Sequence, residues 1–154
     1  MEPTPRPRAK ILVVDDQQGI REQISRTLAE LGHEIVEAAS GAAGLHQAAA
    51  TRPDLVLLDL MLPDMTGIEV CERLRGQPET RDCPIIVVSG LQTGAALEDS
   101  IIAGADDFLA KPIDRVELTV RVRSMLRVRN IQDDQRRVEA YIHQLRALRA
   151  GAAS

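Results

Sequence analysis

Five short apolar runs alternate along the chain with five stretches of helical character. The runs are KILVVDD (10–16), HEIVEAAS (33–40), DLVLLD (54–59), CPIIVVSG (83–90) and DDFLAKP (106–112). They are rich in β-branched and other aliphatic residues and too short for buried helices, so we predict strands. Because strands with unbroken apolar runs are buried on both faces, the alternation predicts an α/β fold: a doubly wound parallel sheet of five strands covered by helices on both sides.

The segments between the runs carry helix signals. In QQGIREQISRTLAELG (17–32) apolar residues recur at helical spacing, and Gly32 is placed to cap the helix end. Three more helices are predicted at 40–52, 66–76 and 93–105. From Asp114 a single extended last helix is predicted to continue without a breaker to Gly151.

Length and composition indicate the class of protein. A chain of 154 residues, 44% hydrophobic and 27% charged, has the size and character of one soluble globular domain. No apolar run approaches the roughly 18 residues of a membrane span, and MEPTPRPRAK (1–10) lacks the apolar segment of a secretory signal. We therefore expect a cytoplasmic protein without membrane contact, in which residues 1–9 form a disordered lead-in.

Cysteine and charge patterns argue against further classes. Cys71 and Cys83 lack metal-binding spacing and are expected to be structural thiols in a reducing compartment. Acidic residues outnumber basic ones by 17 to 7 between 11 and 113, whereas 9 arginines and 5 acids occupy 114–154. An acidic body does not attract nucleic acid, and aromatic stacking surfaces are missing, so we expect no nucleic-acid partner.

Polar residues stand where four of the predicted strands end. Asp15 and Asp16 end the first, Asp59 the third, Ser89 the fourth and Lys111 the fifth. Carboxyl ends of parallel strands meet at one sheet edge, where such folds bind ligands. Three crowded carboxylates repel one another, which a hard divalent cation such as Mg²⁺ would relieve. A lysine and a hydroxyl beside them complete a set suited to phosphoryl transfer, with the central Asp59 as acceptor nucleophile.

Four motifs in this chain resemble those of the receiver domain of two-component response regulators. They are VVDD (13–16), LLDLMLPDMTGIEV (57–70), VVSG (87–90) and GADDFLAKP (104–112), in the family's order and within residues 10–127. The resemblance implies a flavodoxin-like fold of strand order 2-1-3-4-5 with a phosphoacceptor aspartate after the third strand. Asp59 falls on that position, and its phosphoryl donor would be a sensor histidine kinase or a phosphotransfer protein.

The resemblance also implies a metal site. Asp16 would ligate Mg²⁺ directly, Asp15 would act mostly through a bound water, and the backbone carbonyl of Met61 would add a ligand. Lys111 would pair with the phosphoryl oxygens, or with Asp59 before transfer. The chain would then be a phosphoacceptor switch that catalyses its own phosphorylation and dephosphorylation, rather than an enzyme with a separate substrate.

A conformational switch is implied around Ser89. Its hydroxyl would donate to a phosphoryl oxygen, and Phe108 would turn inward when Ser89 moves. The Lys111–Pro112 peptide bond is cis in that family. Met61 and Leu91, two residues beyond the acceptor and the hydroxyl, are both apolar, so we expect slow autodephosphorylation.

Other polar residues are expected to lie outside the site. Asp106 and Asp107 are at the start of the fifth predicted strand, away from its carboxyl end, and we expect them to be solvated. His33, His46 and His143 have no partner at ligand spacing and receive no role.

The last predicted helix is longer than a receiver requires. Residues 128–150 form an extension whose apolar residues fall on the a and d positions of a heptad frame, with Gln135 as the polar exception at an a position. The apolar positions are Val128, Ile131, Val138, Ile142 and Leu145. We predict a short parallel coiled coil and hence a homodimer, with a helix folded back on the receiver as the alternative. Residues 151–154 are expected to form a flexible end.

The extension leaves the type of regulator open. It resembles the linker between a receiver and an output domain such as a diguanylate cyclase, phosphodiesterase, phosphatase or histidine kinase, and no such domain lies in these 154 residues. A stand-alone receiver and the receiver portion of a longer regulator both agree with the sequence.

Two other function classes disagree with particular residues. A hydrolase of the haloacid-dehalogenase type also uses an aspartate after a strand, but it needs a second aspartate where this chain has Met61. A flavin or nucleotide carrier of flavodoxin-like fold needs a Ser/Thr/Gly-rich first loop to hold phosphate, whereas DDQQG (15–19) would repel it.

Overall fold

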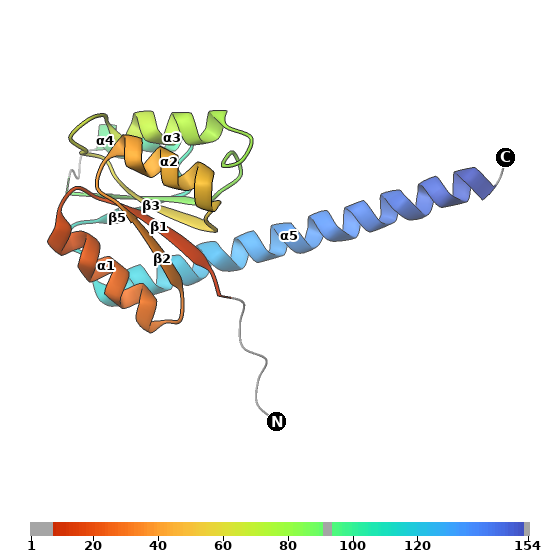
Figure 1. Ribbon diagram of the computed structural model, residues 1–154, viewed down its shortest axis with the longest axis horizontal. Coiled ribbons are helices and arrows are strands. Elements are labelled where there is room, and N and C mark those ends of the chain that lie inside the picture. Colours follow the sequence, from red (N-terminus) through yellow and green to blue (C-terminus); the bar gives the residue numbers. More distant parts are fainter. Residues whose placement is uncertain (1–7, 91–93, 153–154) are drawn as a thin grey trace, which may run out of the picture.

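The chain forms one five-stranded parallel sheet with helices packed on both of its faces. The computed structural model describes residues 8–90 and 94–152. Its elements are β1 (Lys10–Val14), α1 (Gln18–Glu30), β2 (Glu34–Ala38), α2 (Gly41–Thr51), β3 (Leu55–Asp59), α3 (Gly67–Gly76), β4 (Ile85–Ser89), α4 (Gly94–Ile102), β5 (Asp107–Ala110) and α5 (Arg115–Ala152). The strand order is β2-β1-β3-β4-β5, which confirms the predicted doubly wound, flavodoxin-like fold (Figure 1).

Two hydrophobic cores lie on opposite faces of the sheet. Helices α1 and α5 cover one face, and α2, α3 and α4 cover the other (Figure 1). Successive residues of a central strand alternate between the cores: Leu57 packs with α1 and α5, and Leu58 packs with α2 and α3. Every residue of β3 and β4 is buried, which explains why their sequences show unbroken apolar runs.

Local signals end α1 where the sequence predicted. Gly32 has a φ of +91°, a conformation that glycine adopts without strain. Its amide donates to the carbonyl of Ala29 at 2.9 Å, and the amide of His33 donates to that of Leu28 at 3.3 Å. These are the two hydrogen bonds of a Schellman motif, so Gly32 is the predicted C-cap.

Helix α5 runs for 38 residues from Arg115 to Ala152, rather than ending at residue 150. Its first part packs on the sheet through Leu118 and Val122, and the remainder projects away from the domain (Figure 1). The extension therefore does not fold back on the receiver, and the alternative prediction is wrong. No helix among residues 8–90 and 94–152 is both long and apolar enough to cross a membrane.

The described end of the predicted lead-in is tied to the domain. The carbonyl of Ala9 accepts a hydrogen bond from the amide of Glu34 at 2.9 Å, and Ala9 is buried. Residues 1–7 lie outside the described part of the chain.

Asp106 is exposed, as expected, and Asp107 is half-buried, but both acids also form ion pairs that the sequence did not predict. A guanidinium nitrogen of Arg75 lies 2.8 Å from Asp106 Oδ2, which also accepts the backbone amide of Ile85 at 2.8 Å. Arg121 donates to Asp107 at 2.9 Å. Both acids are therefore structural anchors, one joining α3 to the start of β4 and the other joining β5 to α5.

The two cysteines are free thiols buried in the domain. Burial raises the pKa of Cys71 and of Cys83 to about 11. Both thiols therefore remain protonated and contribute as small apolar side chains.

Candidate functional site

Three carboxylates meet at the carboxyl edge of the sheet, as the sequence predicted. Asp15 and Asp16 directly follow β1, and Asp59 is the last residue of the neighbouring strand β3. One carboxylate oxygen from each lies within 4.8 Å of the other two. Asp15 and Asp59 are buried and Asp16 is exposed, so the cluster opens to solvent on one side.

Lys111 supplies a positive charge to this cluster. Its Nζ lies 3.1 Å from Oδ2 of Asp15 and 3.1 Å from Oδ2 of Asp59. The backbone amide of Lys111 donates to the carbonyl of Ser89 at 2.9 Å, which fixes the residue beside the end of β4. The Lys111–Pro112 peptide bond is cis, as the family resemblance implies. Burial disfavours the ammonium, but its close contacts with the Asp15 and Asp59 carboxylates and its attraction to their charges together outweigh burial and raise the pKa of Lys111.

Asp59 is a carboxylate whose charge is poorly compensated. Its Oδ1 accepts the backbone amide of Met61 at 3.1 Å, and its Oδ2 accepts Lys111. Burial raises the pKa of Asp59, and the nearby charge of Asp15 raises it further. The hydrogen bonds from Met61 and Lys111 lower the pKa but only partly offset burial. The group therefore retains a net preference for neutralisation or for a further cation.

Two residues that sequence reasoning missed hold Asp15 in place. The amide of Gln17 donates to Asp15 Oδ1 at 2.9 Å, and Arg21 Nη1 donates to the Asp15 carbonyl at 2.8 Å. The side-chain oxygen of Gln17 also lies 3.5 Å from Lys111 Nζ. Both residues follow the paired acids within six positions, at the start of α1, and that placement was the available signal.

Comparison with protein families identifies the domain. Residues 11–123 match the family model described as the response regulator receiver domain. The chain belongs to the response regulator receiver domain family. Proteins of this family act as signalling switches that interact with histidine kinases or phosphotransfer partners.

Curated relatives of this receiver are response regulators that are longer than the chain. It is 38% identical over 146 residues to "Response regulator PleD" from Caulobacter vibrioides, a match covering 95% of this chain and 32% of that protein. It is 40% identical over 118 residues to "Response regulator MprA" from Mycobacterium tuberculosis, covering 77% and 50%. A third relative, "DNA-binding dual master transcriptional regulator RpaA" from Synechocystis, is 39% identical over 121 residues, covering 77% and 49%. The chain thus spans between a third and a half of these relatives.

Solved receiver structures share the fold. A CheY-like receiver domain protein from Methanospirillum hungatei superposes with a TM-score of 0.77 at 28% identity, covering 82% of this chain and 99% of that one. A response regulator from Chloroflexus aurantiacus superposes with a TM-score of 0.75 at 34% identity, covering 78% and 98%.

The residues of this receiver fit a magnesium ion. Three carboxylates supply hard oxygen donors within a few ångströms of one another, and among residues 8–90 and 94–152 the two buried ones pair with a single lysine. A divalent cation with oxygen ligands would relieve that imbalance. The β3–α3 loop begins beside the cluster, where the Met61 amide donates to Asp59 Oδ1 at 3.1 Å.

The predicted switch residues share one face of the sheet. Ser89 ends β4 and is 1% exposed, and it pairs in register with Ala110 of β5. Phe108, two residues before Ala110, is half-buried against the core that α2, α3 and α4 cover. Side chains two residues apart on a strand point to the same face, so Ser89 and Phe108 lie on the side of the sheet that α4 covers.

The two residues predicted to tune the phosphoryl lifetime differ in what the structure describes. Met61 follows the acceptor closely, and its side chain is 63% exposed. Leu91 lies outside the described residues.

Proposed function

We propose that this receiver accepts a phosphoryl group on Asp59 from the phosphohistidine of a sensor histidine kinase or phosphotransfer protein, in a Mg²⁺-dependent reaction. One observation carries the proposal: Asp59 ends a buried central strand 3.1 Å from Lys111 and within 4.8 Å of two further carboxylates. Carboxylate, ammonium and metal-binding acids are the parts that phosphoryl transfer to an aspartate uses.

The chain's own residues have distinct parts in this reaction. An oxygen of Asp59 attacks phosphorus while the phosphorus–nitrogen bond to the donor imidazole breaks, which leaves an acyl phosphate and a free histidine. Lys111 neutralises charge on the phosphoryl oxygens, and Ser89 donates its hydroxyl to one of them. Asp15, Asp16, Asp59 and the Met61 carbonyl would hold Mg²⁺, which supplies positive charge for the transferred group.

The phosphorylated state would act on the β4–β5 side of the domain. Ser89 moves toward the phosphoryl group, and Phe108 then turns inward into the space released beside it. Met61 and Leu91 stand two residues beyond the acceptor and the hydroxyl in the sequence, and their apolar side chains would favour a slow hydrolysis of the acyl phosphate.

Mass spectrometry tests the proposed acceptor. Incubation with a small phosphodonor and Mg²⁺ should add one phosphoryl group to the wild type, mapped to Asp59, and none to Asp59→Asn. Chelation of Mg²⁺ should abolish the adduct. An adduct on another residue, or none on the wild type, would contradict the proposal.

The extension of α5 fits a parallel homodimer. The heptad positions Val128, Ile131, Val138, Ile142 and Leu145 are all exposed, between 42% and 56%. Side chains of this kind are uncommon on the exposed length of a helix unless another surface covers them. A second copy offers the same stripe, and a two-fold interface needs self-complementary surfaces.

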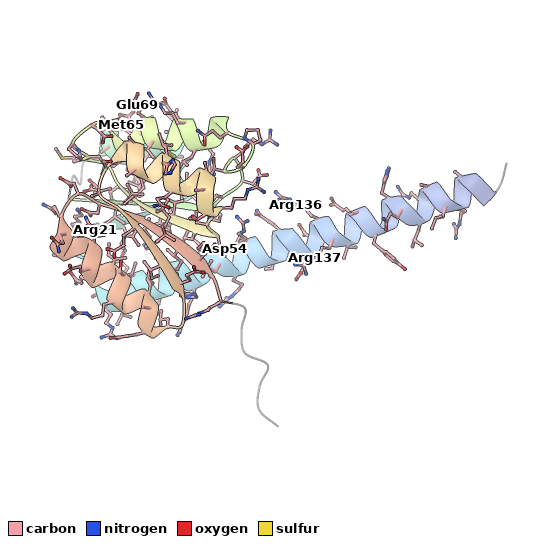
Figure 2. The ribbon with its side chains drawn as sticks, in the orientation of Figure 1. Arg21, Asp54, Met65, Glu69, Arg136 and Arg137 are labelled. Atoms are coloured by element: carbon pink, nitrogen blue, oxygen red, sulfur yellow. The ribbon has the colours of Figure 1, made fainter. Side chains whose placement is uncertain are left out.

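The receiver contacts a different side of α5 from this stripe. Arg129 lies 4.0 Å from Asp54, and Arg136 lies 3.4 Å from Asp82. Both arginines occupy the b position of the heptad frame, so the seam stays accessible to a second chain. Figure 2 shows Asp54 near the point where α5 leaves the domain, and Arg136 and Arg137 on opposite sides of the helix.

A second candidate is the receiver portion of a longer regulator, with residues 10–127 as the receiver and 128–150 as the connecting coiled coil. The match to PleD supports it, because 95% of this chain aligns with 32% of that protein. An output domain such as a diguanylate cyclase, phosphodiesterase, phosphatase or kinase would then follow the coiled coil. Sequencing the gene downstream of Ser154 tests this candidate, since an immediate stop codon would contradict it.

A further inference from the structure

Asp64 caps a helix that is distant in the sequence. Its Oδ1 accepts the backbone amide of Gly41 at 2.8 Å, and its Oδ2 accepts that of Ala42 at 2.8 Å. Ser40 accepts the next amide, that of Ala43, at 3.1 Å. The first three amides of α2 are therefore satisfied, two of them by a carboxylate from the loop between β3 and α3.

The tip of the same loop also packs on α2. A Cβ placed at Gly41 would overlap the side chain of Met65, so the loop approaches a position where only glycine fits. Met65 lies beside the start of α2 (Figure 2). Farther along α2, the absence of a side chain at Gly44 lets the helix pack closely on Val14, which lies two residues before Asp16. Helix α2 therefore contacts both the β3–α3 loop and the end of β1.

The base of the loop is fixed to the proposed phosphoacceptor. Met61 and Thr66 form an isolated antiparallel bridge, and the amide of Gly67 donates to the carbonyl of Leu60 at 2.8 Å. The amide of Met61 donates to Asp59 Oδ1. The loop is thus a narrow turn, with Asp64 anchored on α2 at one end and Met61 beside Asp59 at the other.

We infer that Asp64 is a positioning residue for the site: its anchor on α2 sets the orientation of the loop that places the Met61 amide on Asp59. The same orientation would direct the Met61 carbonyl toward a metal ion held by the acidic cluster. The inference deepens the proposed function and rests on it, because the carbonyl of Met61 matters only if the cluster holds a metal ion. Loss of the anchor frees the tip of the loop and lets the Met61 peptide unit change orientation.

A purely structural role predicts a different result. If Asp64 only stabilised α2, its removal would lower the melting temperature while the Met61 peptide and Mg²⁺ affinity kept their wild-type behaviour. A positioning role predicts a local change at Met61 and weaker Mg²⁺ binding under conditions where the protein remains folded. The two roles are therefore separable by local and global measurements on the same variants.

The test compares Asp64→Ala with Asp64→Asn and with Glu79→Ala. Glu79 is exposed in the loop between α3 and β4, at the opposite edge of the sheet from the acidic cluster. Glu79→Ala therefore removes one negative charge and leaves the β3–α3 loop intact. Three quantities are measured on each 154-residue chain: the Mg²⁺ dissociation constant by calorimetry, the hydrogen-exchange rate of the Met61 amide by NMR, and thermal unfolding. Asp64→Asn keeps one acceptor oxygen and provides the test if Asp64→Ala does not fold.

We expect Asp64→Ala to weaken Mg²⁺ binding by about tenfold, the scale seen when groups that orient metal ligands are removed. Exchange of the Met61 amide should accelerate by a similar factor, with Asp64→Asn intermediate and Glu79→Ala close to wild type. Unchanged Mg²⁺ affinity and Met61 exchange in Asp64→Ala would overturn the inference, whatever happens to its melting temperature. A loss of affinity equal to that of Glu79→Ala would overturn it as well.

Phosphorylation of the wild type tests the proposed function separately from this inference. If Asp59 of the wild type takes no phosphoryl group with Mg²⁺, the proposed function fails. The exchange rate of the Met61 amide needs no metal, and an unaltered rate in Asp64→Ala with normal wild-type phosphorylation overturns the positioning role alone.

Discussion

At the scale of single residues, the main feature is a carboxylate at the end of a fully buried strand. Asp59 is 5% exposed and shares one ammonium, that of Lys111, with Asp15. Burial of charges at such close range costs free energy, so the arrangement lowers the stability of the fold unless another cation neutralises part of the charge. Side chains with strongly shifted pKa values cluster at the functional sites of proteins, and the raised pKa of Asp59 follows that pattern.

This cost predicts that Asp59→Asn stabilises the Mg²⁺-free protein. The pKa of Asp59 is higher in the folded protein than in the unfolded chain, so its ionised form lowers stability at pH 7. We expect the variant to gain about 1 kcal/mol in the free energy of unfolding, a typical size for a single substitution, because the burial of a charge and its repulsion by Asp15 are both removed. Urea denaturation at pH 7 in the presence of a chelator measures this difference.

The same electrostatics fix the sign of the pH dependence. As the pH falls through the raised pKa, folded wild type takes up a proton at Asp59, and its disadvantage relative to Asp59→Asn disappears. The stability difference should therefore be largest at neutral pH, shrink as the solution is acidified, and shrink again when saturating Mg²⁺ is added to the wild type at pH 7. A variant less stable than the wild type at neutral pH would show that Asp59 is well compensated.

Residue identities at the strand ends were predictable because each follows its own apolar run. The contact of Asp64 with α2 was not predictable, since its partners are distant in sequence: Asp64 caps a helix that begins 23 residues earlier. The ion pair of Asp106 was missed for the same reason, because its partner Arg75 lies 31 residues away. Single-sequence patterns report which residues face an edge or a core, and they carry little information on which side chains meet across the fold.

At the scale of elements, short-range signals placed all ten helices and strands of the described chain. The predicted ranges exceed the observed ones mainly where polar residues flank a strand, as at β5, which spans Asp107–Ala110 within the predicted 106–112. Such signals do not report close contacts between elements, and the connection from β3 to α3 contains one. Gly67 begins α3 with its Cα against the backbone of Asp59, and a Cβ there would overlap the Asp59 carbonyl oxygen.

This close approach predicts a large effect of Gly67→Ala. The methyl group must displace backbone rather than a flexible side chain, so we expect a loss of about 2–3 kcal/mol in the free energy of unfolding, as for overpacked sites. The displaced backbone carries Asp59, so phosphorylation by a small phosphodonor should also slow. Urea denaturation and the rate of adduct formation measure the two effects.

Gly76→Ala is the matched control in the same helix. A Cβ at Gly76 meets nothing within 4 Å, and alanine favours helix, so this variant should be as stable as the wild type or up to about 1 kcal/mol more stable. Equal stability of Gly67→Ala and Gly76→Ala would contradict the close packing of α3 on the acceptor.

At the scale of the whole molecule, one unbroken helix, α5, connects the receiver to its extension. Helix α5 has 38 residues and is therefore about 57 Å long at 1.5 Å per residue. Helices in proteins gain most of their stability from packing against other elements. The described extension packs on the receiver only near its start (Figure 1). The proposed dimer would therefore also stabilise the extension as a helix.

The proposed dimer predicts that one lysine substitution weakens dimer association and that a second, two residues away, leaves association unchanged. Ile142→Lys places a charge at an a position of the seam, whereas Ala140→Lys places the same side chain at an f position on the far side of the helix. We expect Ile142→Lys to weaken the dimer by at least tenfold in dissociation constant and Ala140→Lys to leave it near wild type. Light scattering over a concentration series measures both, and a monomeric wild type would contradict the seam itself.

Gln135 decides how specific such a dimer is. It is the polar residue at an a position of the frame, between Ile131 and Val138, and a polar side chain there sets register and two-stranded state at a cost in stability. Gln135→Ile should therefore tighten association and raise the melting temperature, while admitting trimers or shifted registers. Analytical ultracentrifugation measures the mass of the assembly, and a single Cys introduced at Ser124 reports register through disulfide formation. A Gln135→Ile variant that remains a two-stranded dimer with unchanged affinity would show that position 135 faces solvent, and that the helices meet along another stripe.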